Sequence, residues 1–225
     1  MAEDINGYFK AVSQRLARFD RDATVEFCLG LLEDGKVTVA VLYEQILAPA
    51  LNAITIARAD EDRLIWQEHA MTSIVRSVIE CARPYVLKER DALGNAGKAG
   101  RVILVCPEDE YHELGIRMGA DFYTIAGFEA LFIGANTPRV NILSAVEQLK
   151  PDVVNIGVSN FLHLVALKKI IAALRDDLAP GIAITVSGSA FSRTGMDAAE
   201  FGADNILNTF EDIAAFGRNR YETGI

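Results

Sequence analysis

A histidine in an acidic loop is the residue of this sequence best placed to do chemistry. An apolar run, residues 102–106, ends at Pro107, and the loop that follows carries Glu110 and His112. Apolar residues then recur at helical spacing from Leu114 onward. A short aliphatic run of this kind predicts a strand that is buried on both faces. His112 is therefore expected just outside the carboxyl end of a parallel strand, where open α/β sheets bind ligands.

The imidazole of His112 has two interpretations. Histidine is the commonest metal ligand in proteins, and a strand-end loop gives it access to a bound group. A histidine in a surface loop can equally be a plain loop residue. The choice depends on whether other loops at the same edge of the sheet also carry residues that bind a ligand.

Two further loops do carry small polar residues at expected strand ends. Ser159 follows one apolar run, and Gly188 and Ser189 follow the next. The apolar runs that indicate strands lie at 102–106, 129–133, 153–158, 182–186 and around 204–207. Helical patterns alternate with these runs, which predicts a doubly wound parallel sheet of five strands in flavodoxin-like order. We expect all three loops at one edge of this sheet.

The first half of the chain has a different pattern. Residues 1–93 are expected to form a helical bundle, residues 94–100 a linker, and residues 101–225 the α/β domain. Four amphipathic patterns with short connections indicate a four-helix bundle. The predicted signals are an apolar stripe over residues 5–19, N-caps at Asp22 and Thr38, a kink at Pro49, and a fourth start after the acidic residues 60–62. The linker precedes its strand and ends Gly-Lys-Ala, so we do not interpret it as a phosphate loop.

The loop around His112 resembles the Asp-x-His-x-x-Gly motif of cobalamin-binding domains. The sequence Glu110-Tyr111-His112-Glu113-Leu114-Gly115 has the histidine and the glycine, with glutamate in place of the aspartate. The resemblance implies that His112 coordinates cobalt from below, in place of the nucleotide base of the cofactor. It implies that Glu110 orients this histidine, as carboxylates do beside metal-bound imidazoles. It also implies that Gly115 leaves room for the nucleotide tail.

The resemblance extends to the other two loops. Ser159 and Phe161 stand where cobalamin-binding domains have Ser-x-Leu, whose serine binds the tail base; Ser159 is also an expected helix N-cap. Gly188 and Ser189 stand where the family has Gly-Gly, against which the tail base packs. His163 is a rival axial ligand, or otherwise a residue at a helix terminus.

The helical half is similar to the cap that precedes many such domains, through residues 43–49 and Gln67-Glu68-His69. Glu68 and His69 are interpreted as a cap-lining or structural pair, with His69 as an upper axial ligand in the alternative. The cap tryptophan of the cobalamin-dependent photoreceptors is replaced by Arg58, and Trp66 lies on another turn. The resemblance therefore favours hydroxo- or methylcobalamin over adenosylcobalamin.

Charge and composition limit the classes of partner. The 225 residues include 22 basic and 31 acidic residues, so the formal net charge is −9. A field of this sign disfavours direct binding to DNA or to anionic membranes. No apolar run reaches the ~20 residues of a membrane span, and the acidic N-terminus lacks a signal-peptide core. Three cysteines without metal or redox spacing favour a reduced, cytoplasmic protein.

The continuation of the histidine motif, Leu114 to Met118, resembles the regulatory members of the family, which are photoreceptor regulators and antirepressors. The leading hypothesis is a cobalamin-binding sensor without its own DNA-binding domain, which acts through a protein partner such as a transcription regulator and is not itself an enzyme. One alternative is a corrinoid methyl carrier whose partner is a methyltransferase. Another is a degenerate domain that binds haem or no cofactor. A homo-oligomer formed through the bundle stays open.

Overall fold

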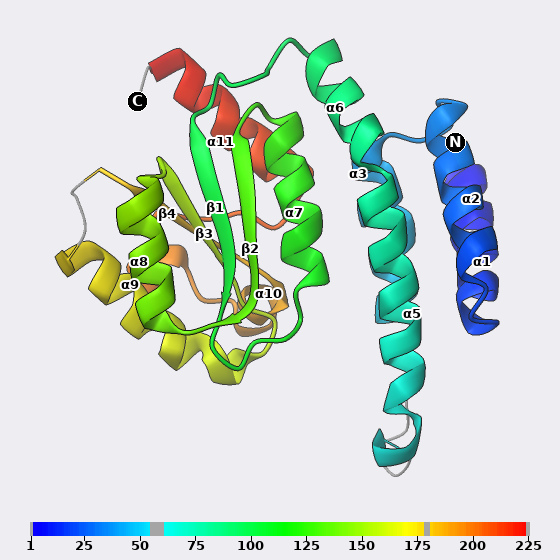
Figure 1. Ribbon diagram of the computed structural model, residues 1–225, viewed down its shortest axis with the longest axis horizontal. Helices are drawn as coiled ribbons and strands as arrows, with labels where there is room; N and C mark the ends of the chain where they lie inside the picture. The colour runs from blue at the N-terminus through cyan, green and yellow to red at the C-terminus, as the bar shows by residue number, and fades with distance from the viewer. Residues whose placement is uncertain (1, 55–60, 178–180, 224–225) are drawn as a thin grey trace. The chain divides into compact units, whose positions relative to one another are not determined.

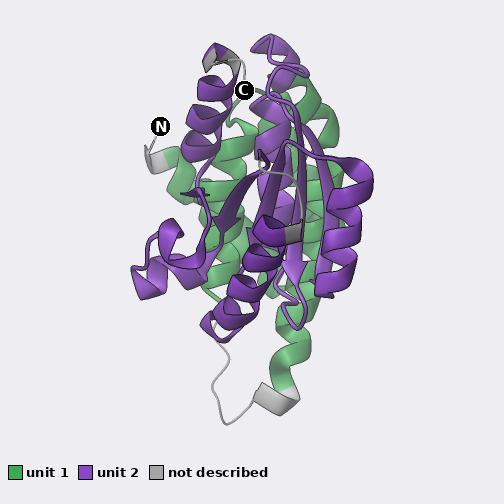
Figure 2. Cartoon of the chain, turned by 90° about the vertical axis from the view of Figure 1, so that its left-hand side faces the viewer, with its two compact units in different colours: residues 1–89 green, residues 90–225 purple. Residues whose placement is uncertain are grey.

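The computed structural model describes residues 2–54, 61–177 and 181–223 (Figure 1). The chain divides into two compact units, residues 1–89 and 90–225, which Figure 2 colours separately. The division falls four residues before the predicted end of the helical domain. The first unit is helical, and the second contains the parallel sheet.

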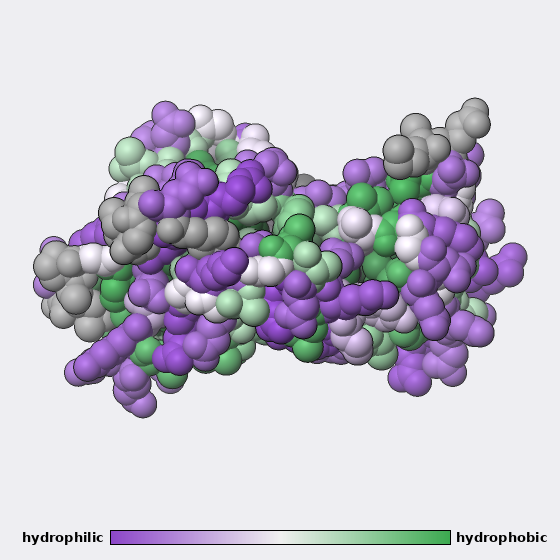
Figure 3. Space-filling model, turned by 90° about the horizontal axis from the view of Figure 1, so that it is seen from above, coloured by the Kyte–Doolittle hydropathy of each residue, from purple (hydrophilic) through white to green (hydrophobic). Residues whose placement is uncertain are grey.

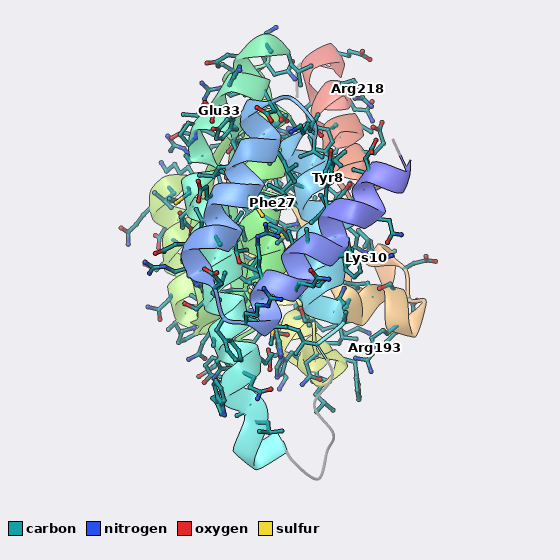
Figure 4. The ribbon with its side chains drawn as sticks, turned by 90° about the vertical axis from the view of Figure 1, so that its right-hand side faces the viewer. Tyr8, Lys10, Phe27, Glu33, Arg193 and Arg218 are labelled. Atoms are coloured by element: carbon teal, nitrogen blue, oxygen red, sulfur yellow. The ribbon has the colours of Figure 1, made fainter. Side chains whose placement is uncertain are left out.

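The helices of the first unit follow the amphipathic patterns of the sequence. They are α1 (Ala2–Ala17), α2 (Arg21–Glu33), α3 (Val39–Val41), the π-helical η1 (Leu42–Leu47), α4 (Ala48–Asn52), α5 (Glu61–Cys81) and α6 (Arg83–Ala92), which crosses the division. Their buried side chains include Leu16, Leu42, Tyr43 and Ile79. Between α1 and α2, Tyr8 meets Phe27 edge to face, with ring centres 6.3 Å apart (Figure 4). The Arg15 guanidinium lies 4.4 Å from the Phe27 ring centre.

Of the two N-caps predicted for the first unit, one is wrong and one is confirmed. Asp20, not Asp22, caps α2, because the Ala23 N–H donates to the Asp20 carboxylate at 3.1 Å. Thr38 caps α3 as predicted, with its hydroxyl accepting from the Val41 N–H at 3.2 Å. The segment after the acidic residues forms two helices rather than one: α5 ends at Cys81, and α6 begins at Arg83.

The third helix is irregular before Pro49 rather than at it. The backbone widens to π-helical spacing over Leu42–Leu47, and the Ala48 N–H donates to the Tyr43 carbonyl five residues earlier. Proline has no N–H for the carbonyl four residues before it, so the regular ladder is interrupted in this turn. Asp60, part of the acidic cluster predicted before the next helix, lies outside the described residues.

The second unit has the predicted sheet. Its strands are β1 (Arg101–Pro107), β2 (Glu129–Thr137), β3 (Val153–Gly157), β4 (Ala183–Ser187) and β5 (Asn205–Ile206). They pair in parallel in the order β2-β1-β3-β4-β5, which confirms the flavodoxin-like prediction. The order reverses beside β1, so the loops after β1 and β3 diverge to opposite faces at the same edge. A crevice at this edge is where open α/β sheets place ligands.

Helices cover both faces of the sheet (Figure 1). One face carries α7 (Leu114–Ile125) and α11 (Phe210–Thr223), and the other carries α8 (Arg139–Leu149) and α9 (Leu164–Asp177). The short α10 (Ser189–Thr194) follows β4. Thr137 ends β2, Pro138 is the N-cap of α8, and the helix begins at Arg139. Proline fits this place because it lacks the N–H that a helix start leaves unpaired.

Each face of the sheet has its own core. On the α8–α9 face, Ile103 and Val105 pack with Ile156 in an aliphatic cluster. On the α7 face, Tyr123 meets the Phe128 ring edge to face at 5.2 Å. The alternation of side chains along a strand explains why β1 supplies both cores from consecutive residues.

The surface agrees with the composition. Hydrophilic residues cover most of the face seen in Figure 3, with apolar residues in scattered patches. Within the described residues, none of the helices combines the length and the hydropathy that crossing a bilayer would require.

Candidate functional site

The loop after β1 places one carboxylate inside the protein. Asp109 has a positive φ of 67°, and the Glu110 N–H donates to the Pro107 carbonyl at 3.1 Å, so the chain turns back on itself. Asn136, near the end of β2, accepts from the Asp109 N–H through its side chain at 2.9 Å and donates from its own N–H to the Glu110 carbonyl at 2.9 Å. This turn leaves the Glu110 side chain 0 % exposed.

The Glu110 carboxylate joins two strand-end loops through its two oxygens. Oε1 accepts from the backbone N–H of His112 at 3.0 Å and lies 2.7 Å from the His112 Nδ1. Oε2 accepts from the backbone N–H groups of Ser159 at 2.8 Å and Asn160 at 2.9 Å, and lies 3.1 Å from the His163 Nδ1. A single buried carboxylate therefore holds the loops after β1 and β3 together.

The hydrogen bonds decide the charge of Glu110. Burial by itself raises the pKa of the Glu110 carboxyl, but hydrogen bonds from His112, Asn160 and Ser159 outweigh burial and hold the pKa well below its usual range. An ionised carboxylate can only accept hydrogen bonds, so both imidazoles contribute Nδ1–H as donor. This hydrogen-bond pattern corresponds to the tautomer whose lone pair is on Nε2.

The two histidines differ in access. The His112 side chain is 66 % exposed, whereas that of His163 is 18 % exposed. A bulky ligand can therefore reach the His112 ring far more easily. Cys106, at the end of β1, does not compete as a ligand, because burial and the charges of Glu110 and Glu113 raise the pKa of its thiol to about 12.

The loop after β4 is attached to the loop after β3. Gly188 has a φ of +113°, and a Cβ added there would lie 2.2 Å from the Val158 carbonyl oxygen, so glycine is required. The Ser189 hydroxyl donates to the Ser159 carbonyl at 3.2 Å. Ser159 itself does not cap the following turn, contrary to expectation. Asn160 does, accepting from the Leu162 N–H at 3.0 Å, because it lies one residue closer to the turn.

The loops after β1 and β3 carry exposed apolar side chains. Tyr111 lies beside His112 in the sequence, and both it and Leu162, after β3, are exposed. Phe161 is 50 % exposed, with the guanidinium of Arg193 5.8 Å from its ring centre. A Cβ added at Gly115 would meet no heavy atom within 4 Å. The packing of the chain itself does not demand a glycine at this position.

The predicted cap residues lie in the first unit. Glu68 is half-buried and His69 is exposed, both on α5. Trp66, also on α5, packs against Phe19, with the two ring centres 5.3 Å apart. Arg58 lies outside the described residues. The assignment of Glu68 and His69 to the site stays a prediction.

Comparison with known protein families identifies the domain that contains this edge of the sheet. The profile of the B12 binding domain matches residues 100–215, just over half of the chain. The chain belongs to the B12 binding domain family. The match spans β1 to β5, and therefore includes all three loops described above. This finding supports cobalamin as the cofactor.

One curated relative is the HTH-type transcriptional repressor CarA of Myxococcus xanthus, 27 % identical over 114 residues. The match covers 51 % of this chain and 36 % of the repressor, so the chain spans about a third of the length of that relative.

Solved structures share the fold of the whole chain. The monomethylamine corrinoid protein of Methanosarcina barkeri superimposes with a TM-score of 0.75 at 16 % identity, over 97 % of this chain and 99 % of that one. A cobalamin-binding protein from Desulfitobacterium hafniense DCB-2 gives a TM-score of 0.53 at 16 % identity, over 94 % and 97 %. The likeness extends the shared fold to the helical half, which the family profile does not cover.

The sequence analysis did not predict the roles of three residues that lie around Glu110. Asn160 and Asn136 hold loops, and His163 binds the same carboxylate as His112. The position of His163, a few residues after the third strand, was a sequence signal for a place near the site. That its Nδ1 contacts Glu110, and does not face a ligand, follows only from the fold.

Gly188→Ala is expected to destabilise the folded chain by about 3 kcal/mol, because it combines a positive φ with a clash against backbone. Urea unfolding monitored by circular dichroism measures the change. Gly195→Ala is the matched control: this glycine ends the same helix at a φ of +65°, yet its Cβ would meet no atom within 4 Å. The control should cost only about 1 kcal/mol. Equal losses in the two variants would contradict the clash with Val158.

Proposed function

We propose that this protein binds cobalamin at the carboxyl edge of its sheet, with the Nε2 atom of His112 as the lower axial ligand of cobalt. The observation that carries the proposal is an exposed imidazole whose Nδ1 lies 2.7 Å from a buried carboxylate. A carboxylate in this position fixes the tautomer that directs the Nε2 lone pair outward and raises the basicity of the ring. Glutamate at position 110 therefore takes the part of the aspartate of the family.

The surroundings fit a large tetrapyrrole-like ring with a tail. Exposed apolar residues such as Phe161 offer surface to the ring, and the space beside Gly115 offers room for the tail. In this proposal the Ser159 hydroxyl binds the tail base, and the base packs against the backbone of Gly188 and Ser189. When bound, the cofactor would supply a cobalt centre that can exchange ligands. The protein supplies the lower nitrogen and excludes the nucleotide base of the cofactor from that position.

We propose further that the protein is a cobalamin-responsive regulator that acts through a protein partner. The relative at 27 % identity is a transcriptional repressor, and the residues after His112 resemble the regulatory members of the family. The net charge of −9 suits a protein partner better than direct contact with DNA. A change in the bound cofactor would favour one of two conformations, and the partner would bind one of them more tightly.

The first test is a titration of the purified protein with hydroxocobalamin, methylcobalamin and adenosylcobalamin, in darkness and after illumination. We expect binding of the first two with a visible spectrum of nitrogen-ligated cobalamin, and weaker binding of the third. A featureless difference spectrum with all three cobalamins would refute cobalamin binding, and a Soret band acquired with haemin instead would favour the haem alternative.

A methyl carrier is the second candidate, because the fold match to a corrinoid protein extends over nearly the whole of both chains. The two functions differ in what happens to a bound methyl group. Transfer of the methyl group from the methylcobalamin-loaded protein to a thiol, accelerated by a partner methyltransferase, would favour the carrier. A methyl group that stays in place until light or a ligand releases it would favour the regulator.

Gly115→Leu should weaken cobalamin binding by roughly 10- to 100-fold, since a side chain there would occupy the space proposed for the tail. The folded protein should lose little stability, because an added Cβ meets no neighbouring atom. Equilibrium titration by absorbance gives the affinity, and urea unfolding gives the stability. Gly119→Ala on the same helix, whose Cβ would make an ordinary 3.9 Å contact with Leu104, should leave the affinity unchanged. An unaltered affinity in Gly115→Leu would place the tail elsewhere.

A further inference from the structure

Strand β2 forms one edge of the sheet, and the outer side of this strand can accept another strand (Figure 1). The strand order gives β2 one neighbour, β1, and no other strand in the described part of the chain pairs with it. The Glu129 N–H donates to the Gly100 carbonyl, so alternate residues from Glu129 direct their backbone groups toward β1. The backbone groups of Ala130 and Phe132 therefore face away from the sheet. An edge of this kind can pair with a strand of another chain.

The middle of β2 lacks the usual protection of an edge strand. Residues 130–135 include no charged residue and no proline. Proteins commonly place lysine, proline or inward-pointing charges on an exposed edge, because these residues prevent pairing with another chain. Gly134, with a φ of 128°, changes the course of the strand, and the Ala135 N–H beyond it donates to the Glu113 carboxylate at 3.1 Å. The stretch that is open to pairing is therefore centred on Phe132.

Two apolar side chains lie exposed along this edge. Leu131 is 44 % exposed and Ile133 is 36 % exposed. Leu131 is in register with Ile103, which belongs to the aliphatic core of the α8–α9 face, so Leu131 points to that face. Ile133, two residues further on, points to the same face. Helix α8 packs over β1 and leaves both side chains exposed, so another strand beside β2 would extend this core over them.

We propose that β2 pairs in antiparallel fashion with the β2 of a second copy of this chain, which joins the two sheets into one. A two-fold axis at Phe132 sets Leu131 of each copy opposite Ile133 of the other, and all four side chains then lie in one row on the same face. An axis at Leu131 would instead set Glu129 opposite Ile133. An axis at Ile133 would set Leu131 opposite Ala135. The axis at Phe132 therefore gives each exposed apolar side chain an apolar partner of similar size.

The charges at the two ends of the edge complement each other in an antiparallel pair. Lys98 and Arg101 lie beside the start of β2 and outnumber Glu129 there. Exposed Glu108 and Asp109 follow β1, and Asp109 is hydrogen-bonded to the end of β2. Antiparallel pairing brings the basic end of one copy toward the acidic end of the other, whereas parallel pairing would bring the two acidic ends together. The charge pattern thus favours a second copy in the orientation that the apolar row requires.

Sedimentation velocity of the full, cofactor-free chain over a concentration series tests the proposal. We expect a monomer–dimer equilibrium with a Kd on the order of 10 µM, because a single pair of strands is a small interface. Ile133→Lys should weaken this dimer by at least about tenfold, since it sets a cation against Leu131 of the other copy. A wild type that stays monomeric throughout the series would overturn the proposal.

Val165→Lys is the matched control for Ile133→Lys. Val165 is an apolar residue with 66 % exposure, and it lies on α9, away from the edge. This variant should dimerise as the wild type does, because the same charge is added outside the proposed interface. Equal weakening in the two variants would show that net charge and not the β2 edge controls association. A dimer that survives Ile133→Lys unchanged would place the interface elsewhere, and either result would overturn the proposal.

A double variant tests the register. Leu131→Lys and Ile133→Glu should each weaken the dimer by about tenfold, because each leaves a charge opposite an apolar side chain. Combined in one chain, they set every lysine opposite a glutamate of the other copy. The double variant should therefore associate at least about threefold more tightly than either single variant. A double variant weaker than both would refute this register.

Amide hydrogen exchange of the wild type locates the contact without any substitution. Exchange at the backbone N–H groups of Ala130 and Phe132 should slow as the protein concentration rises, because pairing protects them. Circular dichroism of each variant checks that its fold is kept. Concentration-dependent protection confined to the helical unit, with unchanged exchange in β2, would overturn the proposal even if the chain dimerises.

Discussion

His112→Ala should remove the nitrogen-ligated spectrum of the cobalamin-loaded protein and lower the affinity by at least about 100-fold. The reason is that the exposed ring supplies the proposed axial nitrogen, and even indirect partners of a metal ligand typically affect affinity by about 10- to 100-fold. Titration with hydroxocobalamin, followed by visible absorbance, measures both quantities in one experiment.

Chemical rescue is the control for this variant. Free imidazole added to His112→Ala should restore the nitrogen-ligated spectrum, because the side chain removed leaves access to the same position. Urea unfolding of the variant should show a loss of about 1 kcal/mol, since Glu110 Oε1 keeps the backbone N–H of residue 112 but loses the ring donor. If the variant keeps both the affinity and the spectrum of the wild type, the axial ligand is another residue.

The second large effect is expected for Glu110→Gln, which should destabilise the folded protein by on the order of 3 kcal/mol at pH 7. Its carboxylate is completely buried and accepts from donors on both loops. A glutamine amide offers one acceptor oxygen, and its NH₂ group faces donors such as the Asn160 N–H. Unmatched buried donors of this kind are costly. Glu108→Gln, at an exposed position of the same loop, should change stability by less than about 0.5 kcal/mol.

The loss in Glu110→Gln should depend on pH in a defined direction. The folded protein holds the pKa of Glu110 well below the ordinary value of 4.5, so the unfolded chain binds more protons than the folded chain between the two values. The stabilisation by Glu110 is therefore fully present above about pH 4.5 and is lost as the pH falls through the lower, folded value. Urea unfolding at pH 7 and at pH 4 should show the gap between wild type and variant narrowing at the lower pH. A gap that widens on acidification would mean that Glu110 is not ionised in the folded protein.

The sequence alone determined the features that depend on local pattern. Aliphatic runs and helical periodicity gave the five strands and their alternation with helices, and from these the parallel order follows. The loop motif singled out His112 and Gly115, because two further loops at the same edge of the predicted sheet also carry small residues that suit a ligand. Two predicted N-caps were wrong by one or two residues. Asp20 caps α2 in place of Asp22, and Asn160 caps the turn after β3 in place of Ser159. Neighbouring polar residues compete for the same orphan N–H groups, and only the backbone geometry decides between them.

The tertiary structure decided what converges on Glu110. The donors to its Oε2 come from residues 49, 50 and 53 positions away in the chain. No local pattern predicts such a meeting, because it depends on the register of β1 against β3 and on the turn after each strand. Burial then gives these few bonds their weight, since a carboxylate removed from water must find all its partners within the protein.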